Sequence, residues 1–365
     1  MIAAHRLSLK FATPEKLARV TAVLERYRAT VNAYIHHVWE HGGSLDKETQ
    51  DTVPLGHLSF RMRSHALQHA LGIVAATRAS GRALGKVSCC PVFRGGMTLS
   101  KQLAELVPAR KQGAFDFYLR VSTLSAGNRV DLPLKGTRHL RKLLAVPGAK
   151  LKAGGTIGGR PGRYWLTVWV ELLDLPDKTE GRALGLDIGL NKLVAASDGA
   201  VYGTEMRGVV ARVRRRKPGS KGKRRARRTR DEFINRTLNQ LPWNELKLVA
   251  VERLKNLKKG KKPGRSKQFR KALAPWTYAY VLRRIEWKAR LNRVQRVEVN
   301  PAYTSQKCPS CSHRAKSSRV NEMFTCVRCG YTADADFVGS LNILARAIGE
   351  PMVPQPCAPP SGSES

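Results

Sequence analysis

The chain has 365 residues, enough for two or three packed units, and its 42% hydrophobic content excludes a chain that is disordered throughout. Its 66 lysine and arginine residues outnumber 27 acidic residues and give a net charge of +39, which attracts polyanions. Nucleic acid is therefore the predicted partner, and an anionic membrane surface is the weaker alternative. No apolar run approaches the roughly 20 residues of a membrane span, and the N-terminus lacks a secretory apolar core. We expect a cytoplasmic, nucleoid-associated protein.

The first half of the chain predicts strands with helices inserted between them. Residues 5–12 alternate in polarity, as a strand does. Thr13, followed by proline, signals the start of a long helix, and a second helix is expected over about 57–80. Residues 114–122 and 163–172 alternate at period two, which is typical of half-exposed strands.

From Arg182 onwards the pattern changes. Two strands joined by a short turn are expected first, with Asp187 in the middle of the first strand. A later buried strand ends at Glu252, and a helix over 275–293 and a short strand lead into a cysteine-rich region. A final helix is expected to begin at Asp336.

The tract at 212–230 is dense in lysine and arginine. Its proline and glycines predict a loop that leads into a helix carrying Phe233 and Leu238. A solvated face is the ordinary interpretation, but phosphate contact is favoured because so dense a run of like charge repels itself. A second basic segment follows Glu252. The residues predicted to contact nucleic acid are Arg214, Arg215, Arg216, Arg224, Arg225, Arg227, Arg228, Lys258 and Lys259.

Two CxxC pairs, Cys308 with Cys311 and Cys326 with Cys329, stand close to the C-terminus. Four thiolates form a complete tetrahedral set for one Zn²⁺, and a filled set leaves no open position for chemistry. The predicted zinc is therefore structural. His313 lies nearby and is interpreted as a bystander, because four ligands already suffice.

Three acids are the candidate catalytic residues: Asp187, Glu252 and Asp336. Each is flanked by apolar residues, and a buried acid is costly unless it is paired or binds metal. Acids on separate core elements can converge and hold two Mg²⁺ ions about 4 Å apart, as phosphodiester cleavage requires. Glu252 could instead pair with a neighbouring lysine. Asp334 competes with Asp336 for the third role, and Asp336 is favoured because the apolar helical positions begin just after it.

The stretches "GLDIG", "VAVERL" and "CPSC…CVRCGY…DADFVGSLNI" resemble the three RuvC-type motifs and the zinc ribbon of the TnpB family. These are transposon-encoded RNA-guided nucleases, and the compact type V CRISPR effectors share the motifs. The resemblance is specific over about 182–347 and looser before it. It implies an α+β multidomain protein: an N-terminal wedge β-barrel with a helical recognition insert, and a C-terminal RuvC-like (RNase H-like) α/β nuclease domain with an inserted zinc ribbon.

The resemblance also implies domain limits. The wedge-like barrel is expected at 1–12 and 113–180, the recognition insert at 13–112, the nuclease domain at 181–303 and 333–348, the ribbon, a lid that loads the target strand, at 304–332, and a disordered tail at 349–365. It further implies an RNA-guided DNA endonuclease, whose partners are a guide RNA and double-stranded target DNA that carries a short adjacent motif.

The family roles transfer to single residues. Asp187, Glu252 and Asp336 correspond to the metal-binding acids, and Arg319 matches an arginine of the ribbon that points toward the active site. Val338 departs from the family pattern, which usually has asparagine there, whereas Asn342 and Ile343 are kept. The departure predicts altered positioning, with activity retained.

Other classes of function fit parts of the pattern. A guide-directed DNA-binding protein with weak or lost cleavage would share the motifs, but the complete set of acids favours a nuclease. A plain zinc-ribbon nucleic-acid-binding protein, in which the acids satisfy core arginines, would show no Mg²⁺-dependent cutting. A recombinase of the DDE type is disfavoured, because nothing in the N-terminal half indicates an end-binding domain.

Overall fold

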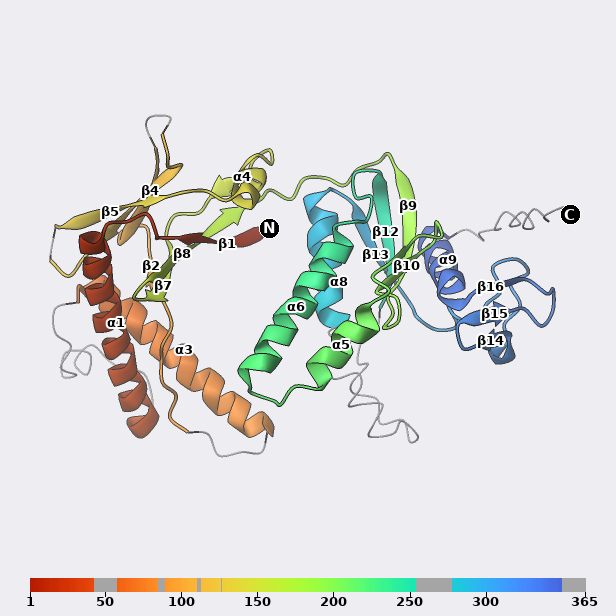
Figure 1. Ribbon diagram of the computed structural model, residues 1–365, viewed down its shortest axis with the longest axis horizontal. Coiled ribbons are helices and arrows are strands. Elements are labelled where there is room, and N and C mark those ends of the chain that lie inside the picture. Colours follow the sequence, from red (N-terminus) through yellow and green to blue (C-terminus); the bar gives the residue numbers. More distant parts are fainter. Residues whose placement is uncertain (43–57, 85–88, 110–112, 126, 254–277, 350–365) are drawn as a thin grey trace, which may run out of the picture. The chain divides into compact units, whose positions relative to one another are not determined.

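The structure is a computed structural model that describes residues 1–42, 58–84, 89–109, 113–125, 127–253 and 278–349. The chain divides into two compact units, residues 1–174 and 175–365 (Figure 1). None of the described helices is long and apolar enough to cross a bilayer. Lys258, Lys259 and the predicted tail beyond Gly349 lie outside the described residues.

The first unit contains a five-stranded antiparallel sheet in which β8 (Arg163–Glu171) lies between β1 (Ile2–Ser8) and β7 (Gly155–Arg160). β2 (Met97–Leu99) extends the sheet beyond β7, and the short β6 (Lys150–Leu151) also pairs with β8. Side chains of β8 alternate between buried and half-exposed positions, so one face of the sheet enters the core and the other stays open. The strand predicted at 5–12 instead spans residues 2–8, because the chain turns before the next helix.

Two long helices pack against each other in this unit, α1 (Pro14–His41) and α3 (Phe60–Leu84). The Thr13 hydroxyl accepts a hydrogen bond from the Lys16 backbone N–H, which confirms the predicted start of α1. Tyr27 and Tyr34 on the inner face of α1 are fully buried.

A second, three-stranded antiparallel sheet is formed by β3 (Ala104–Pro108), β4 (Phe117–Ser122) and β5 (Arg129–Leu134), and the short helix α4 (Arg138–Leu144) follows it. β2 and β3 precede residue 113, yet they pair with β7 and β4. The range 13–112, expected to be a helical insert, therefore contains two strands that pair with strands outside it, as well as α1 and α3.

The second unit is built on a five-stranded sheet of order β11-β10-β9-β12-β13. β9 (Arg182–Asp187), β10 (Val194–Ala196) and β11 (Val201–Tyr202) form an antiparallel meander, whereas β12 (Leu246–Glu252) and β13 (Gln295–Val299) run parallel to β9. Asp187 is the last residue of β9, not a residue in its middle as predicted.

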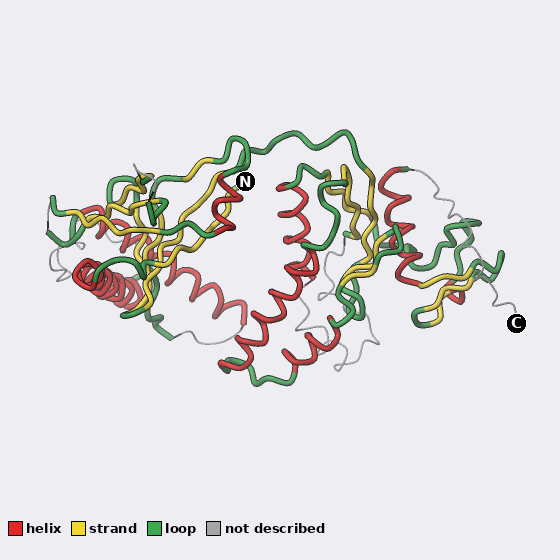
Figure 2. The backbone as a smooth tube through the Cα atoms, turned by 45° about the horizontal axis from the view of Figure 1, so that its top comes forward, coloured by secondary structure: helices red, strands yellow, loops and turns green. Residues whose placement is uncertain are grey.

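Helices cover both faces of this sheet (Figures 1 and 2). On one face, α5 (Met206–Arg214), α6 (Lys221–Leu238) and α8 (Tyr278–Leu291) bury residues such as Ile234 and Ile285 against Val249 and Val251. On the other face, α9 (Ala335–Ile348) packs Ile343 against Ala250 and Val299. Successive residues of β12 point to opposite faces of the sheet, so this strand contributes to a hydrophobic core on each side.

A small three-stranded sheet precedes α9: β14 (Arg319–Val320), β15 (Met323–Thr325) and β16 (Thr332–Asp334). β14 follows a short 3₁₀ turn at Lys316–Ser318. β16 ends at Asp334 and α9 begins at Ala335, so the ribbon passes into the helix without a linker.

Candidate active site

Sheet topology brings the first two candidate acids side by side. Asp187 and Glu252 are the last residues of β9 and β12, two parallel neighbours whose preceding residues, Leu186 and Val251, are paired. The carboxyl ends of parallel strands meet at one edge of a sheet, where α/β proteins commonly place their sites. The two carboxylates therefore share this edge although 65 positions separate them in sequence.

The third acid, Asp336, lies in the first turn of α9, which packs across β9. Two glycines allow the close approach. A Cβ at Gly339 would lie 2.7 Å from Oδ2 of Asp187, and a Cβ at Gly185 would lie 2.2 Å from the Ser340 carbonyl oxygen. A larger side chain at Gly185 would push the helix off the strand, and one at Gly339 would displace the Asp187 carboxylate. Sequence reasoning missed both glycines, although a glycine inside an apolar strand or helix is a signal of close backbone approach.

The electrostatics of the site reflect this convergence. Burial, together with the charges of Glu252 and Asp336, raises the pKa of Asp187 to about 7. Burial also raises the pKa of Glu252, against the effect of the hydrogen bond that its carboxylate accepts from the Thr304 hydroxyl. Ionising these acids in the folded protein therefore costs free energy, and a bound cation would offset that cost.

Asp336 and Asp334 have different surroundings. The Arg319 guanidinium donates to Oδ1 of Asp336 at 3.2 Å, and Lys192 Nζ lies 3.6 Å from its Oδ2. Asp334 caps α9 instead: its Oδ1 accepts hydrogen bonds from the backbone N–H groups of Asp336 and Phe337 at 3.0 and 3.1 Å. Lys192 also pairs with Asp334. The Asp334 carboxylate is engaged in capping, and the charge of Asp336, not that of Asp334, is among the causes that raise the pKa of Asp187.

Three further contacts at this site escaped sequence reasoning. Lys192, from the turn after β9, bridges both aspartates, and the neighbouring Asn191 donates to Glu322 of the ribbon at 2.6 Å. Asn342 donates to the carbonyl oxygens of Thr304 and Lys307, both at 2.7 Å. These two hydrogen bonds tie α9 to the segment that contains Thr304, whose hydroxyl donates to Glu252. An isolated lysine or threonine carries no sequence signal for such a role.

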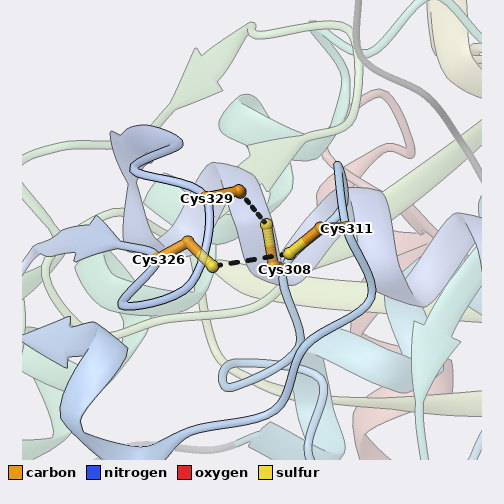
Figure 3. Close-up of side chains that lie close together, drawn as sticks. All are labelled: Cys308, Cys311, Cys326 and Cys329. Carbon is orange, nitrogen blue, oxygen red and sulfur yellow. Dashed lines mark hydrogen bonds between the residues drawn. The ribbon is translucent and has the colours of Figure 1, made fainter.

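The four predicted cysteines lie together (Figure 3). Cys308 Sγ is 3.7 Å from Cys329 Sγ, and Cys311 Sγ is 3.6 Å from Cys326 Sγ. A tetrahedral Zn²⁺ with Zn–S bonds of about 2.3 Å needs S–S separations of about 3.8 Å, so the cluster has the size of such a site. Across the described ranges, no other group of three or more cysteine, histidine or acidic side chains is compact enough for one ion.

The cysteine cluster is joined to the acids through its core. Val338, at the position where the family usually has asparagine, is fully buried against Cys308, Phe324, Cys326 and Ala335. The departure therefore places an apolar contact between α9 and the ribbon. His313 contributes its backbone carbonyl, which accepts a hydrogen bond from Cys308 N–H, and its ring is not part of the cluster.

The basic tract differs from the prediction. The loop expected over 212–230 is a helical hairpin, in which α5 ends at Arg214 and α6 begins at Lys221 with Ser220 as its cap. Pro218 and Gly219 form the turn between the helices, and Gly219 has φ +80°. The described arginines predicted to contact nucleic acid are all exposed on this hairpin: Arg214, Arg215, Arg216, Arg224, Arg225, Arg227 and Arg228. Between the helices lies a cavity of about 270 Å³ that Arg212, Arg216 and Arg225 line.

Comparisons with known proteins point to the same family as the sequence motifs. The family model of the Cas12f1-like TNB domain matches residues 278–343, which contain the cysteines and Asp336. InsQ of Escherichia coli (strain K12), named as a candidate RNA-guided DNA endonuclease, is 27% identical over 265 residues. That match covers 64% of this chain and 65% of InsQ, so the chain spans less than two thirds of this relative.

Two more relatives are shorter matches. The CRISPR-associated endodeoxyribonuclease Cas12f1 of Sulfoacidibacillus thermotolerans is 35% identical over 72 residues, which are 20% of this chain and 17% of Cas12f1. A TnpB-like protein of Methanocaldococcus jannaschii is 30% identical over 118 residues, 32% of this chain and 52% of that protein. The chain is a relative of the TnpB family and of the type V CRISPR effectors, which confirms the resemblance.

A solved structure shares the fold. The cryo-EM structure of CasPhi-2 (Cas12j) bound to crRNA superposes with a TM-score of 0.57 at 10% identity, covering 97% of this chain and 99% of that one. The likeness concerns the fold alone and confirms the α+β multidomain architecture.

Proposed function

We propose that the chain is an RNA-guided DNA endonuclease that hydrolyses phosphodiester bonds at a single RuvC-like site with the aid of Mg²⁺. The observation that carries the proposal is the convergence of Asp187, Glu252 and Asp336 at one sheet edge, where Gly339 lets α9 approach Asp187. The sheet order, an antiparallel meander followed by two parallel strands, supports an RNase H-like domain.

The chemistry of the donor set suits magnesium, although the three carboxylates lie farther apart in this structure than one shared ion requires. Carboxylate oxygens are the hard ligands that Mg²⁺ prefers, and the mutual repulsion that raises the pKa of Asp187 favours a cation between the acids. Two Mg²⁺ ions would stabilise the charge on the attacking and leaving oxygens of the phosphodiester. In this site Arg319 and Lys192 hold the Asp336 carboxylate, and Thr304 orients Glu252.

One structural zinc is proposed at the cysteine cluster. A Cys₄ site is closed and contributes folding free energy to a segment too small for its own core. Its fold presents Arg319 on β14 and Asp334 on β16, next to the first turn of α9. The ribbon is thereby suited to act as a lid beside the acids.

The partners proposed are a guide RNA and double-stranded target DNA with a short adjacent motif. Support comes from the net charge of +39 and from relatives named as RNA-guided or CRISPR-associated nucleases. The strands of the first unit would form the wedge-like domain, and α1 and α3 its recognition insert. The exposed arginines of the α5–α6 hairpin would contact phosphates.

The test begins with the RNA that copurifies with the protein. Sequencing is expected to return one discrete structured RNA, and the complex should cut a plasmid that carries the matching sequence only when Mg²⁺ is present. A guide with a scrambled target segment is the control. Copurification of random cellular RNA, or cutting that ignores the guide, would contradict the proposal, whereas guided binding without cutting would identify a DNA-binding protein.

A further inference from the structure

A cationic cavity of about 640 Å³ opens on the first unit, whereas the candidate acids belong to the second unit. Its walls contain Arg28, Arg94, Arg160, Arg163 and Trp165. No acid lines it. Its volume falls in the range of about 300–1,000 Å³ that is common for ligand sites.

The charge of this cavity is unbalanced within the fold. Arg160 and Arg163 are direct partners across the turn between β7 and β8, and like charges opposite each other destabilise a strand pair. Both are exposed, as is Arg94. In the part of the chain that the structure describes, none of the three makes an ion pair or a side-chain hydrogen bond. The repulsion between Arg160 and Arg163 is therefore not offset by an ion pair within the described structure.

The frame around these arginines is held by directed contacts. Arg28 Nε donates to the Gly95 carbonyl oxygen at 2.9 Å, and its Nη2 donates to that of Gly159 at 2.7 Å. Gly159 has φ +132°, and a Cβ there would lie 2.3 Å from the Arg163 carbonyl oxygen. Arg28 therefore fastens the loop before β2 to β7, which leaves the other three guanidinium groups for a ligand.

Trp165 supplies an aromatic wall on the open face of the sheet. The Arg6 guanidinium lies 4.1 Å from the centre of a Trp165 ring, which fixes one side of the indole. A Cβ at Gly158 would lie 2.6 Å from the ring atom Cζ2, so this glycine makes room for the indole. The ring is only half-buried.

We propose that this cavity is a polynucleotide-binding site, in which Arg94, Arg160 and Arg163 contact phosphates and a base lies against Trp165. Arginines beside an aromatic ring suit a nucleotide unit, because the cations meet the phosphate and the ring meets the base. An inorganic anion would use the cations alone. The choice of a polynucleotide as ligand rests on the proposed function. The cavity shares no residue with the candidate active site, and binding of an oligonucleotide to it can be measured without cleavage.

The experiment compares two triple variants of the full-length chain that lose equal charge. Arg94→Ala with Arg160→Ala and Arg163→Ala removes the cavity cations. Arg138→Ala with Lys142→Ala and Lys150→Ala, all exposed elsewhere in the unit and outside α1 and α3, is the control. Binding of labelled oligouridylate and oligothymidylate is followed by fluorescence anisotropy over a salt series without Mg²⁺. The cavity variant should flatten the slope of log affinity against log salt by about two, and the control by clearly less.

A neutral substitution separates stacking from charge. Trp165→Leu should weaken binding by about tenfold and leave the salt slope unchanged. In the wild type, oligonucleotides that contain 4-thiouridine or 4-thiothymidine should crosslink to the peptide that contains Trp165, a readout that requires no variant to fold.

The two oligonucleotides distinguish the source of the ligand. Tighter binding of the RNA would assign the site to the guide, and tighter binding of the DNA to the target. Equal slopes for the two triple variants, unchanged affinity in Trp165→Leu, or crosslinks confined to other peptides would each overturn the site. None of these failures touches the nuclease proposal, because cleavage by the acids is tested independently.

Discussion

Lys192 Nζ lies 2.5 Å from Oδ2 of Asp334 and 3.6 Å from Oδ2 of Asp336, so one lysine in the turn after β9 bridges the two carboxylates that begin α9. The Lys192 side chain is only 17% exposed, which keeps it next to its partners. The contact links the strand that ends at Asp187 to the helix cap, and it thereby sets where Asp336 stands.

Replacing Lys192 with methionine should slow guided cleavage about tenfold, because misplacement of a catalytic group by even about 1 Å can cost more than that. Lys192→Arg keeps the charge and should recover most of the rate. RNA affinity should remain unchanged in both variants. Equal rates for Lys192→Met and the wild type, measured in single-turnover assays, would exclude this positioning role.

The substitutions Asp187→Ala, Glu252→Ala and Asp336→Ala should each lower Mg²⁺-dependent cleavage at least about 1,000-fold while nucleic-acid binding persists. The three acids would share the metal ions, so the loss of one should cost nearly as much activity as the loss of all three. Asp334→Ala should cost less activity but more thermal stability, because it removes the cap of α9. If Asp334→Ala abolished cutting and Asp336→Ala spared it, the assignment of the third acid would be wrong.

Cys326→Ser should release the zinc and loosen the ribbon, since a structural site contributes folding free energy. Elemental analysis is expected to find about one zinc per wild-type chain and much less in the variant, with reduced cleavage because Arg319 and Asp334 lie on the ribbon strands. Cys90→Ser, at an exposed cysteine outside the cluster, is the matched control. Wild-type protein that is purified without chelators and contains no zinc would contradict the site.

Replacing Arg224, Arg225, Arg227 and Arg228 with alanine should flatten the salt dependence of RNA binding by about two to four units. Alanine preserves α6, and exposed arginines contribute little to folding, so the melting temperature should hardly change. The four-fold lysine variant keeps the charge and serves as the control. Coincident slopes for the alanine variant and the wild type would show that the hairpin is only a solvated surface.

His69 predicts a pH dependence in the first unit. Burial, with a smaller effect of His65, holds the pKa of His69 below its usual 6.5, and its ring contacts the Tyr27 hydroxyl at 3.1 Å and the Thr98 hydroxyl at 3.2 Å. The unfolded chain then takes up the proton more readily, so stability is retained above about pH 6.5 and falls as the pH drops below it. Thermal melts of wild type and His69→Gln should converge at low pH; parallel curves would rule His69 out.

The sequence by itself determined the features that depend on neighbouring residues. The start of α1 at Thr13, the spacing of the four cysteines and the strand that ends at Glu252 follow from capping, ligand spacing and polarity within a few positions. The same signals placed Asp187 on a strand but not at its end. Local signals failed at the basic tract, where Pro218 and Gly219 suggested a loop. Buried contacts of Ile234 and Leu238 and the Ser220 cap instead sustain α6 through Arg224 and Arg228.

Only the tertiary structure decided which distant residues meet. The order of strands places Asp187 beside Glu252, and the Gly185 and Gly339 contacts bring α9 onto β9. The bridge from Lys192 to Asp334 spans 142 positions, and the cavity of Arg94, Arg160 and Arg163 joins a loop to a hairpin. Such contacts depend on sheet order and close packing of backbone, which the pattern of any single segment does not encode.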